Sequence, residues 1–223
     1  MKRVNPLCLF VLLGCFLLLP ISDAVALTPL EQATREATKY PEDVRVQSLL
    51  ARAYNEDGQY SKALWVAKAV LGKKPGYPAA LLEFAHANRF LGNHEEAVKA
   101  YHAYLGTNPL SLEGQVGNSE SLAHLGSWDE AFSSARVIIN AHPKNSGGYE
   151  ALGRAYRLAG RPDEAVGLLN QGLSFDPGNK RILYELGLCY TELGDQSSAL
   201  AQYEKLLDRD EKMAQQLFQI IYP

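Results

Sequence analysis

Apolar side chains recur along the chain at the spacing of one helix face. Tyr149, Leu152, Gly153 and Tyr156 fall at i, i+3, i+4 and i+7, which is typical of an amphipathic helix. A second helical pattern follows Gly160, a residue without a Cβ that fits a tight turn at a helix end. The pattern therefore predicts two antiparallel helices joined by a short turn.

This helix-turn-helix pattern returns every 34 residues without insertion or deletion. Three series of identical residues mark the period: Pro41, Pro75, Pro109, Pro143 and Pro177; Gly58, Gly92, Gly126, Gly160 and Gly194; and Ala63, Ala97, Ala131, Ala165 and Ala199. A fixed period in this range predicts a stacked array of repeats. Such an array works by presenting a surface, so the period favours binding over catalysis.

The repeated unit resembles the tetratricopeptide repeat. The resemblance rests on the helix crossing, the turn and the closing loop: Tyr149, Leu152, Gly153, Tyr156, Gly160, Ala165 and Pro177. It covers residues 44–213 and implies an all-α fold, a right-handed α-solenoid of five 34-residue helix-turn-helix repeats. The units are 44–77, 78–111, 112–145, 146–179 and 180–213.

The flanking segments continue the repeat phase as half units. Residues 27–43 predict an N-terminal capping helix and residues 214–223 a C-terminal one, because an open solenoid end would expose core. We expect Leu217, Ile220 and Ile221 to seal the fifth repeat.

The sequence departs from the repeat pattern at two places, and each departure predicts a local change in structure. Glu211 stands where the loop proline belongs, so we expect the preceding helix to continue past that point. Asn118 and Leu122 replace the usual bulky residues of the first helix, so the third repeat is expected to be the least well packed.

Residues 1–26 have the layout of a secretory signal peptide. A basic start precedes 15 apolar residues, and Ala24-Val25-Ala26 follows as a small-residue cleavage site. We therefore expect cleavage after Ala26 and an exported, periplasmic or otherwise extracytoplasmic protein. One alternative is a lipid anchor on Cys15, although the apolar core continues beyond this cysteine; another is an uncleaved anchor.

Charge and cysteine content narrow the class of function. The formal net charge of −3 gives no case for binding nucleic acid or anionic membrane. Loss of the signal peptide would leave Cys189 as the only cysteine, expected as a small core residue rather than a reactive thiol.

Candidate chemistry is sparse. The chain lacks phosphate-binding and H-E-x-x-H motifs, and the turn at Gly92 separates His94 and His102 from His86. We therefore expect no catalytic residues, no metal site and no cofactor, and the protein is predicted not to be an enzyme.

The resemblance implies that the first helix of each unit lines a concave groove. Carried over position by position, it predicts these groove residues: Arg52, Asn55, His86, Arg89, Phe90, Glu120, His124, Arg154, Arg157 and Tyr184. Together they form an interrupted stripe of basic residues along the groove. Arginine can bind a carboxylate through two parallel hydrogen bonds. The interpretation is a groove for an acidic or carboxylate-ended segment; the alternative is a solvated helix face. On the first interpretation, changing Arg89 and Arg154 to glutamate weakens partner capture without lowering the melting temperature.

The resulting hypothesis is an interaction scaffold or adaptor of the cell envelope that binds another protein or peptide. It has no nucleic-acid partner and no membrane span in the mature chain. One alternative is a self-assembling structural protein, with Phe218 and Tyr222 at the C-terminus as contact candidates. Another is an outer-membrane lipoprotein that assists pilus or secretion assembly. The lysine and asparagine clamp by which some family members hold a chaperone's C-terminus is absent from the corresponding positions.

Overall fold

The computed structural model describes residues 27–223, so the predicted signal peptide and Cys15 lie outside the described residues. In the described range the chain is all-α, as the repeat pattern predicts. The helices are α1 (Pro29–Lys39), α2 (Val44–Glu56), α3 (Tyr60–Lys73), α4 (Pro78–Phe90), α5 (His94–Leu105), α6 (Leu112–His124), α7 (Trp128–Ala141), α8 (Ser146–Leu158), α9 (Pro162–Phe175), α10 (Lys180–Glu192), α11 (Gln196–Leu207) and α12 (Glu211–Ile221).

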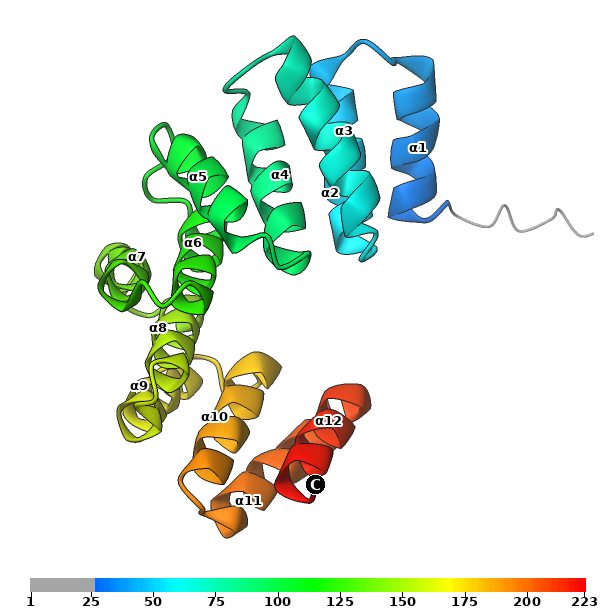
Figure 1. Cartoon of the computed structure of the whole chain (residues 1–223). Helices are drawn as coiled ribbons and strands as arrows, with labels where there is room; N and C mark the ends of the chain where they lie inside the picture. The colour runs from blue at the N-terminus through cyan, green and yellow to red at the C-terminus, as the bar shows by residue number, and fades with distance from the viewer. Residues whose placement is uncertain (1–26) are drawn as a thin grey trace, which may run out of the picture.

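The helices follow an arc whose two ends are α1 and α12 (Figure 1). Each even-numbered helix contacts the even-numbered helix of the next repeat, whereas no two odd-numbered helices of the described chain approach one another closely. The even-numbered helices therefore converge on the inner, concave side, and α5, α7 and α9 lie on the outer side (Figure 1).

The turn glycines set the angle between the two helices of each repeat. All five series members, Gly58 to Gly194, have φ between 72° and 80°, a region that side chains with a Cβ rarely adopt. The residue after each glycine donates its backbone N–H to the carbonyl oxygen five residues earlier, over 2.8–3.0 Å. This closes the last helical turn in the way common at glycine-capped helix ends.

Small residues allow the helices to cross closely. A Cβ on Gly153 would lie 2.6 Å from Leu169 Cγ, and Ala165 on the facing helix is fully buried. Cys189 is also buried, as expected, and burial raises the pKa of its thiol to about 12. The thiol is therefore a packing group at neutral pH.

Two expectations about the C-terminal end are wrong. α11 ends at Leu207 before Glu211, because the Asp210 side chain accepts the backbone N–H of Met213 at 3.0 Å and caps a new helix. Ile220 is 43% exposed, whereas Leu217 and Ile221 are buried and seal the fifth repeat. Within the described residues no helix packs on the Ile220 side of α12, so this position stays exposed.

In the third repeat, the neighbouring residues Gly117 and Asn118 of α6 make contacts with α5 and α7. The ring of Tyr101 on α5 is fully buried and reaches α6, where a Cβ on Gly117 would lie only 2.2 Å from its Oη. Asn118 is buried and its Nδ2 donates to Ser134 Oγ at 2.9 Å, while its Oδ1 has no partner. The looser packing expected for this repeat stays a prediction.

Candidate functional site

The concave side holds a groove of about 590 Å³, lined by residues of α2, α3, α4, α6, α8 and α10. The structure brings six of the predicted groove residues to it: Arg52, Asn55, His86, Arg89, Phe90 and Glu120. The other four, His124, Arg154, Arg157 and Tyr184, are not among its lining residues.

Two predicted groove residues of the first repeat, Arg52 and Asn55, are bonded to an acidic residue of the second. Arg52 Nε donates to Glu83 Oε1 at 2.9 Å, and Asn55 Nδ2 donates to Glu83 Oε2 at 2.9 Å. The Glu83 side chain is 3% exposed, and burial raises the pKa of its carboxyl although both partners lower it. The two donors therefore compensate a carboxylate that burial would otherwise disfavour.

The same arrangement recurs between the fourth and fifth repeats. Arg154 Nε and Arg157 Nε donate to the two oxygens of Glu185 at 2.6 Å and 2.8 Å. Arg157 also donates to Glu192 at 2.8 Å. The positions that pair are 28 and 31 residues apart, as they are for Glu83.

Glu120 joins these pairs across the third repeat. It accepts a hydrogen bond from Arg89 and a second from Arg154 NH1, the latter at 2.6 Å. Its side chain is 7% exposed. We call the whole set the charge ladder: Arg52, Asn55, Glu83, Arg89, Glu120, Arg154, Arg157, Glu185 and Glu192.

The charge ladder changes the meaning of the predicted basic stripe. Its arginines are held by carboxylates of neighbouring repeats, so they fix one repeat to the next. The acidic or carboxylate-ended partner stays a prediction, and this pairing weighs against it. Replacing Arg89 and Arg154 by glutamate would place new acids beside Glu120 and Glu185, so we now expect that double change to impair folding.

One carboxylate in the groove has no such support. Glu150 on α8 lines the groove with a side chain only 7% exposed, and its Oε1 accepts no hydrogen bond. The nearest cation is Arg181, whose Nη1 lies 3.9 Å from Glu150 Oε1 and whose side chain is 62% exposed. Burial raises the pKa of Glu150 to about 7, against the opposing effects of Arg154 and Arg181.

The groove also contains an aromatic pair and an uncharged histidine. Tyr60 and Phe90 stack with ring centroids 4.5 Å apart, and the Arg89 guanidinium lies 3.9 Å above the Phe90 ring. Burial lowers the pKa of His86 to about 3, so this imidazole is uncharged at neutral pH. His86 therefore adds no positive charge to the groove.

His124 lies at the end of α6, where its ring stacks on that of His94 with centroids 4.5 Å apart. Burial lowers the pKa of both imidazoles. Across residues 27–223, no group of three histidine, cysteine or acidic side chains is placed to hold a metal ion.

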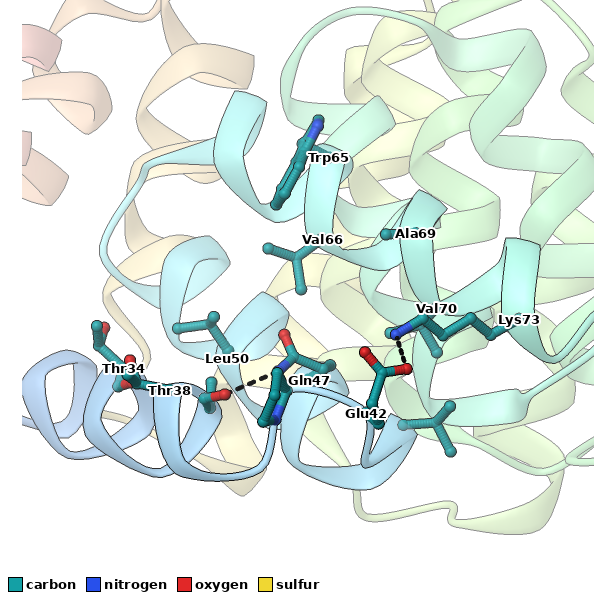
Figure 2. Close-up of a pocket in the computed structure, with 13 residues that line it drawn as sticks. Thr34, Thr38, Glu42, Gln47, Leu50, Trp65, Val66, Ala69, Val70 and Lys73 are labelled. Atoms are coloured by element: carbon teal, nitrogen blue, oxygen red, sulfur yellow. Dashed lines mark hydrogen bonds and ion pairs between the residues drawn. The ribbon is translucent and has the colours of Figure 1, made fainter.

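A second hollow of about 350 Å³ lies between α1, α2 and α3 (Figure 2). Trp65 stands at its rim and is 74% exposed. The polar groups around it are already bonded: Lys73 pairs with Glu42 at 2.8 Å, and Gln47 donates to the Ala37 carbonyl at 3.1 Å (Figure 2). The concave groove, which has an unpartnered polar group, is therefore the better candidate site.

The C-terminal contact candidates lie together on α12 and its end. Phe218 packs against Tyr203 with ring centroids 5.2 Å apart and against Tyr222 at 5.0 Å. Phe218 is 37% exposed and Tyr222 46% exposed. The sequence did not predict Tyr203 as their neighbour.

Comparison with known families identifies the repeat. Models described as tetratricopeptide repeat match residues 24–78 and 82–146, and a further one matches residues 156–217. The chain belongs to the tetratricopeptide repeat family. None of the helices described for this family member is long and apolar enough to cross a membrane.

Several known proteins are similar in sequence to part of this chain. The Hsp70-Hsp90 organizing protein 3 of Arabidopsis thaliana is 31% identical over 122 residues, which is 55% of this chain and 22% of that protein. The small glutamine-rich tetratricopeptide repeat-containing protein 2 of Mycosarcoma maydis is 29% identical over 105 residues, 47% of this chain and 30% of that protein. The chain thus spans less than a third of the length of these relatives.

Solved tetratricopeptide repeat structures share the fold. TTC0263 of Thermus thermophilus has a TM-score of 0.72 at 23% identity, covering 81% of this chain and 100% of that one. A Parabacteroides merdae protein has a TM-score of 0.74 at 17% identity, covering 87% and 77%. YrrB, described as having an unusual peptide-binding site, has a TM-score of 0.55 at 17% identity, covering 85% and 99%.

The sequence predicted Glu120 but not the other acidic residues of the site. Glu83 and Glu185 occupy the same position in their repeats, three residues before the groove-lining positions of His86 and Leu188. That coincidence, next to basic residues one repeat earlier, is the signal that could have found them. Glu150 offered no such signal, because its position carries a different residue in every repeat.

Proposed function

We propose that this protein is a scaffold that holds a segment of a partner protein in its concave groove. The observation that carries the proposal is the groove itself, which is built from helices of all five repeats and contains a buried carboxyl oxygen without a hydrogen-bond partner. Tetratricopeptide repeat proteins are in general non-enzymatic scaffolds for protein binding, and this supports the proposal.

The groove binds as a preformed surface. The charge ladder joins consecutive repeats through side chains that are largely buried, such as Glu83, Glu120 and Glu185. A surface held in this way needs little ordering when a partner arrives, so less binding free energy is lost to conformational entropy.

Site-specific crosslinking tests the groove. A photoreactive phenylalanine analogue replaces Val116, which lines the groove, and in a control it replaces Lys99, an exposed residue of α5. We expect partner proteins from the cell envelope fraction to crosslink through position 116 and not through position 99. The same set of proteins from both positions, or none from position 116, contradicts groove binding.

We also propose that the scaffold acts outside the cytoplasm. The pattern of residues 1–26 supports this, with its basic start, apolar core and Ala24-Val25-Ala26. N-terminal sequencing and intact mass of the protein from its native host should give Leu27 as the first residue. A lipidated Cys15 would support the lipoprotein alternative instead, and an intact Met1 would contradict processing.

Self-association is a second candidate, favoured by the exposed apolar side chains of the C-terminal end. Phe218, Ile220 and Tyr222 are each 37–46% exposed, and large aromatics are enriched in interface cores. Changing Phe218 and Tyr222 to serine should lower the mass measured by light scattering while the helical circular dichroism is kept. An unchanged mass together with a large fall in melting temperature would show that these rings only stabilise the cap.

A further inference from the structure

The net charge that a ligand meets in the groove is that of the lining residues which the charge ladder does not neutralise. Five glutamates and three arginines line the groove. Arg52 and Arg89 are both bonded to buried carboxylates, and only Arg181 is largely exposed. The His86 imidazole contributes no charge. The lining is therefore net acidic, although the predicted stripe is basic when read from the sequence alone.

The negative charge of the groove is available to a ligand at one buried residue, Glu150. Its side chain is more than nine-tenths buried, it lines the groove, and no donor satisfies its Oε1. A buried carboxyl oxygen without a donor is costly, and a cation that donates hydrogen bonds would remove that cost. Glu113, which lines the same groove with a side chain 53% exposed, adds a second negative charge.

We propose that the groove receives a lysine or arginine side chain of the partner beside Glu150, and so selects a basic segment. This inference rests on the proposed function and names the class of partner. The exposed Arg181 guanidinium, 3.9 Å from Glu150, is the internal cation that the incoming side chain displaces or joins. Tyr60 and Phe90 offer an aromatic surface within the same groove for the partner's apolar residues.

Selection from a random decapeptide library displayed on phage, with the chain from Leu27 as bait, tests the charge preference. We expect enrichment of lysine and arginine, and crosslinking of the selected peptides through a photoreactive group at position 116. Groove-binding peptides enriched in aspartate or glutamate would overturn this inference and leave the proposed function intact. Selection that yields no groove-binding peptide overturns both.

Three variants then locate the cation, measured with one selected basic peptide by fluorescence anisotropy. Glu150→Gln should weaken binding by about tenfold, since it removes a buried charge partner. Arg181→Gln should strengthen binding, because it removes the competing cation; an acidic ligand would respond in the opposite sense. Glu204→Gln, an exposed change on α11, should leave binding unchanged. Binding that is indifferent to Glu150→Gln overturns the assignment.

The pH dependence gives a readout that a purely structural role would not produce. Glu150 is faced by Arg154 on its own helix, by Arg181 and Glu185 of α10 and by Glu120 of α6. With a pKa of about 7, its ionised fraction rises about tenfold between pH 6 and pH 8. Affinity for the basic peptide should rise accordingly in the wild-type protein and stay flat in Glu150→Gln; equal pH profiles overturn the inference.

Discussion

Replacing Arg154 by methionine tests whether the charge ladder stabilises the solenoid. Arg154 bridges two neighbouring repeats, donating to Glu120 at 2.6 Å and to Glu185 at 2.6 Å, and its side chain is 25% exposed. Methionine keeps most of the aliphatic contact and removes the cation. The change therefore isolates the electrostatic contribution from the packing contribution.

The expected loss of unfolding free energy depends on which cations remain next to each carboxylate after Arg154 is replaced. Removing one member of a buried ion pair costs about 3–5 kcal/mol when the other member is left alone. Here Glu120 retains Arg89 and Glu185 retains Arg157, so neither is left without a cation. Two charge-assisted hydrogen bonds are lost, each worth about 1.5–3 kcal/mol. With the partial exposure of Arg154 taken into account, we expect a loss of about 3 kcal/mol.

Urea unfolding followed by circular dichroism measures this loss. Arg181→Met is the matched control, because that arginine lies 3.9 Å from its acid and is 62% exposed. Surface pairs of this kind contribute less than about 1 kcal/mol. Repeat arrays do not always unfold in one step, so the midpoints and slopes of all variants are compared at one salt concentration.

A loss for Arg154→Met no larger than that for Arg181→Met would refute the role of the charge ladder. A triple variant provides a further check. Adding Glu120→Gln and Glu185→Gln to Arg154→Met also takes these carboxylates away from Arg89 and Arg157, so stability should fall further. No further fall in the triple variant would assign the loss in Arg154→Met to packing.

Three further outcomes are expected. Gly117→Ala should lower stability by about 1–2 kcal/mol in the same urea assay, because the added Cβ would overlap the Tyr101 ring. Gly167→Ala should raise stability by up to about 1 kcal/mol, because the space around Gly167 is open and alanine favours the helix. Ala165→Leu at a fully buried crossing should cost about 1–3 kcal/mol; no loss would place Ala165 outside the crossing. The folded-state pKa of Glu150 is raised from 4.5 to about 7, so its ionisation costs stability as pH rises through this range. Glu150→Gln should therefore be more stable than wild type by on the order of 3 kcal/mol at pH 8 and by little at pH 4, as melts at both pH values will show.

Local signals in the sequence were sufficient for the fold. Gly160 marks the turn because only glycine adopts its positive φ without strain, and Ala165 marks the crossing because no larger residue fits. These requirements act within one repeat, and five copies repeat them in the same register. The helices, their order and their stacking could therefore be predicted from the residues alone.

The C-terminal end departs from the same logic at two residues, Ile220 and Asp210. Ile220 occupies a position that is buried in four of the five repeats, yet within residues 27–223 the helix α12 contacts only α10 and α11, which leave Ile220 exposed. The cap at Asp210 replaced the missing proline through a side-chain hydrogen bond, a solution that the repeat pattern does not encode.

The candidate site depended on contacts between repeats. The sequence placed Arg154 and Arg157 on one helix face, but whether Arg154 faces a partner or a neighbouring glutamate depends on how far consecutive helices converge. In the folded chain that convergence brings Glu185 to within 2.6 Å of Arg154 and leaves Glu150 without a donor. The sequence by itself therefore determined the solenoid and its concave face, because those follow from local geometry repeated five times. Only the tertiary structure decided which charges on that face are already neutralised, because neutralisation depends on distances between residues about 30 positions apart in the chain.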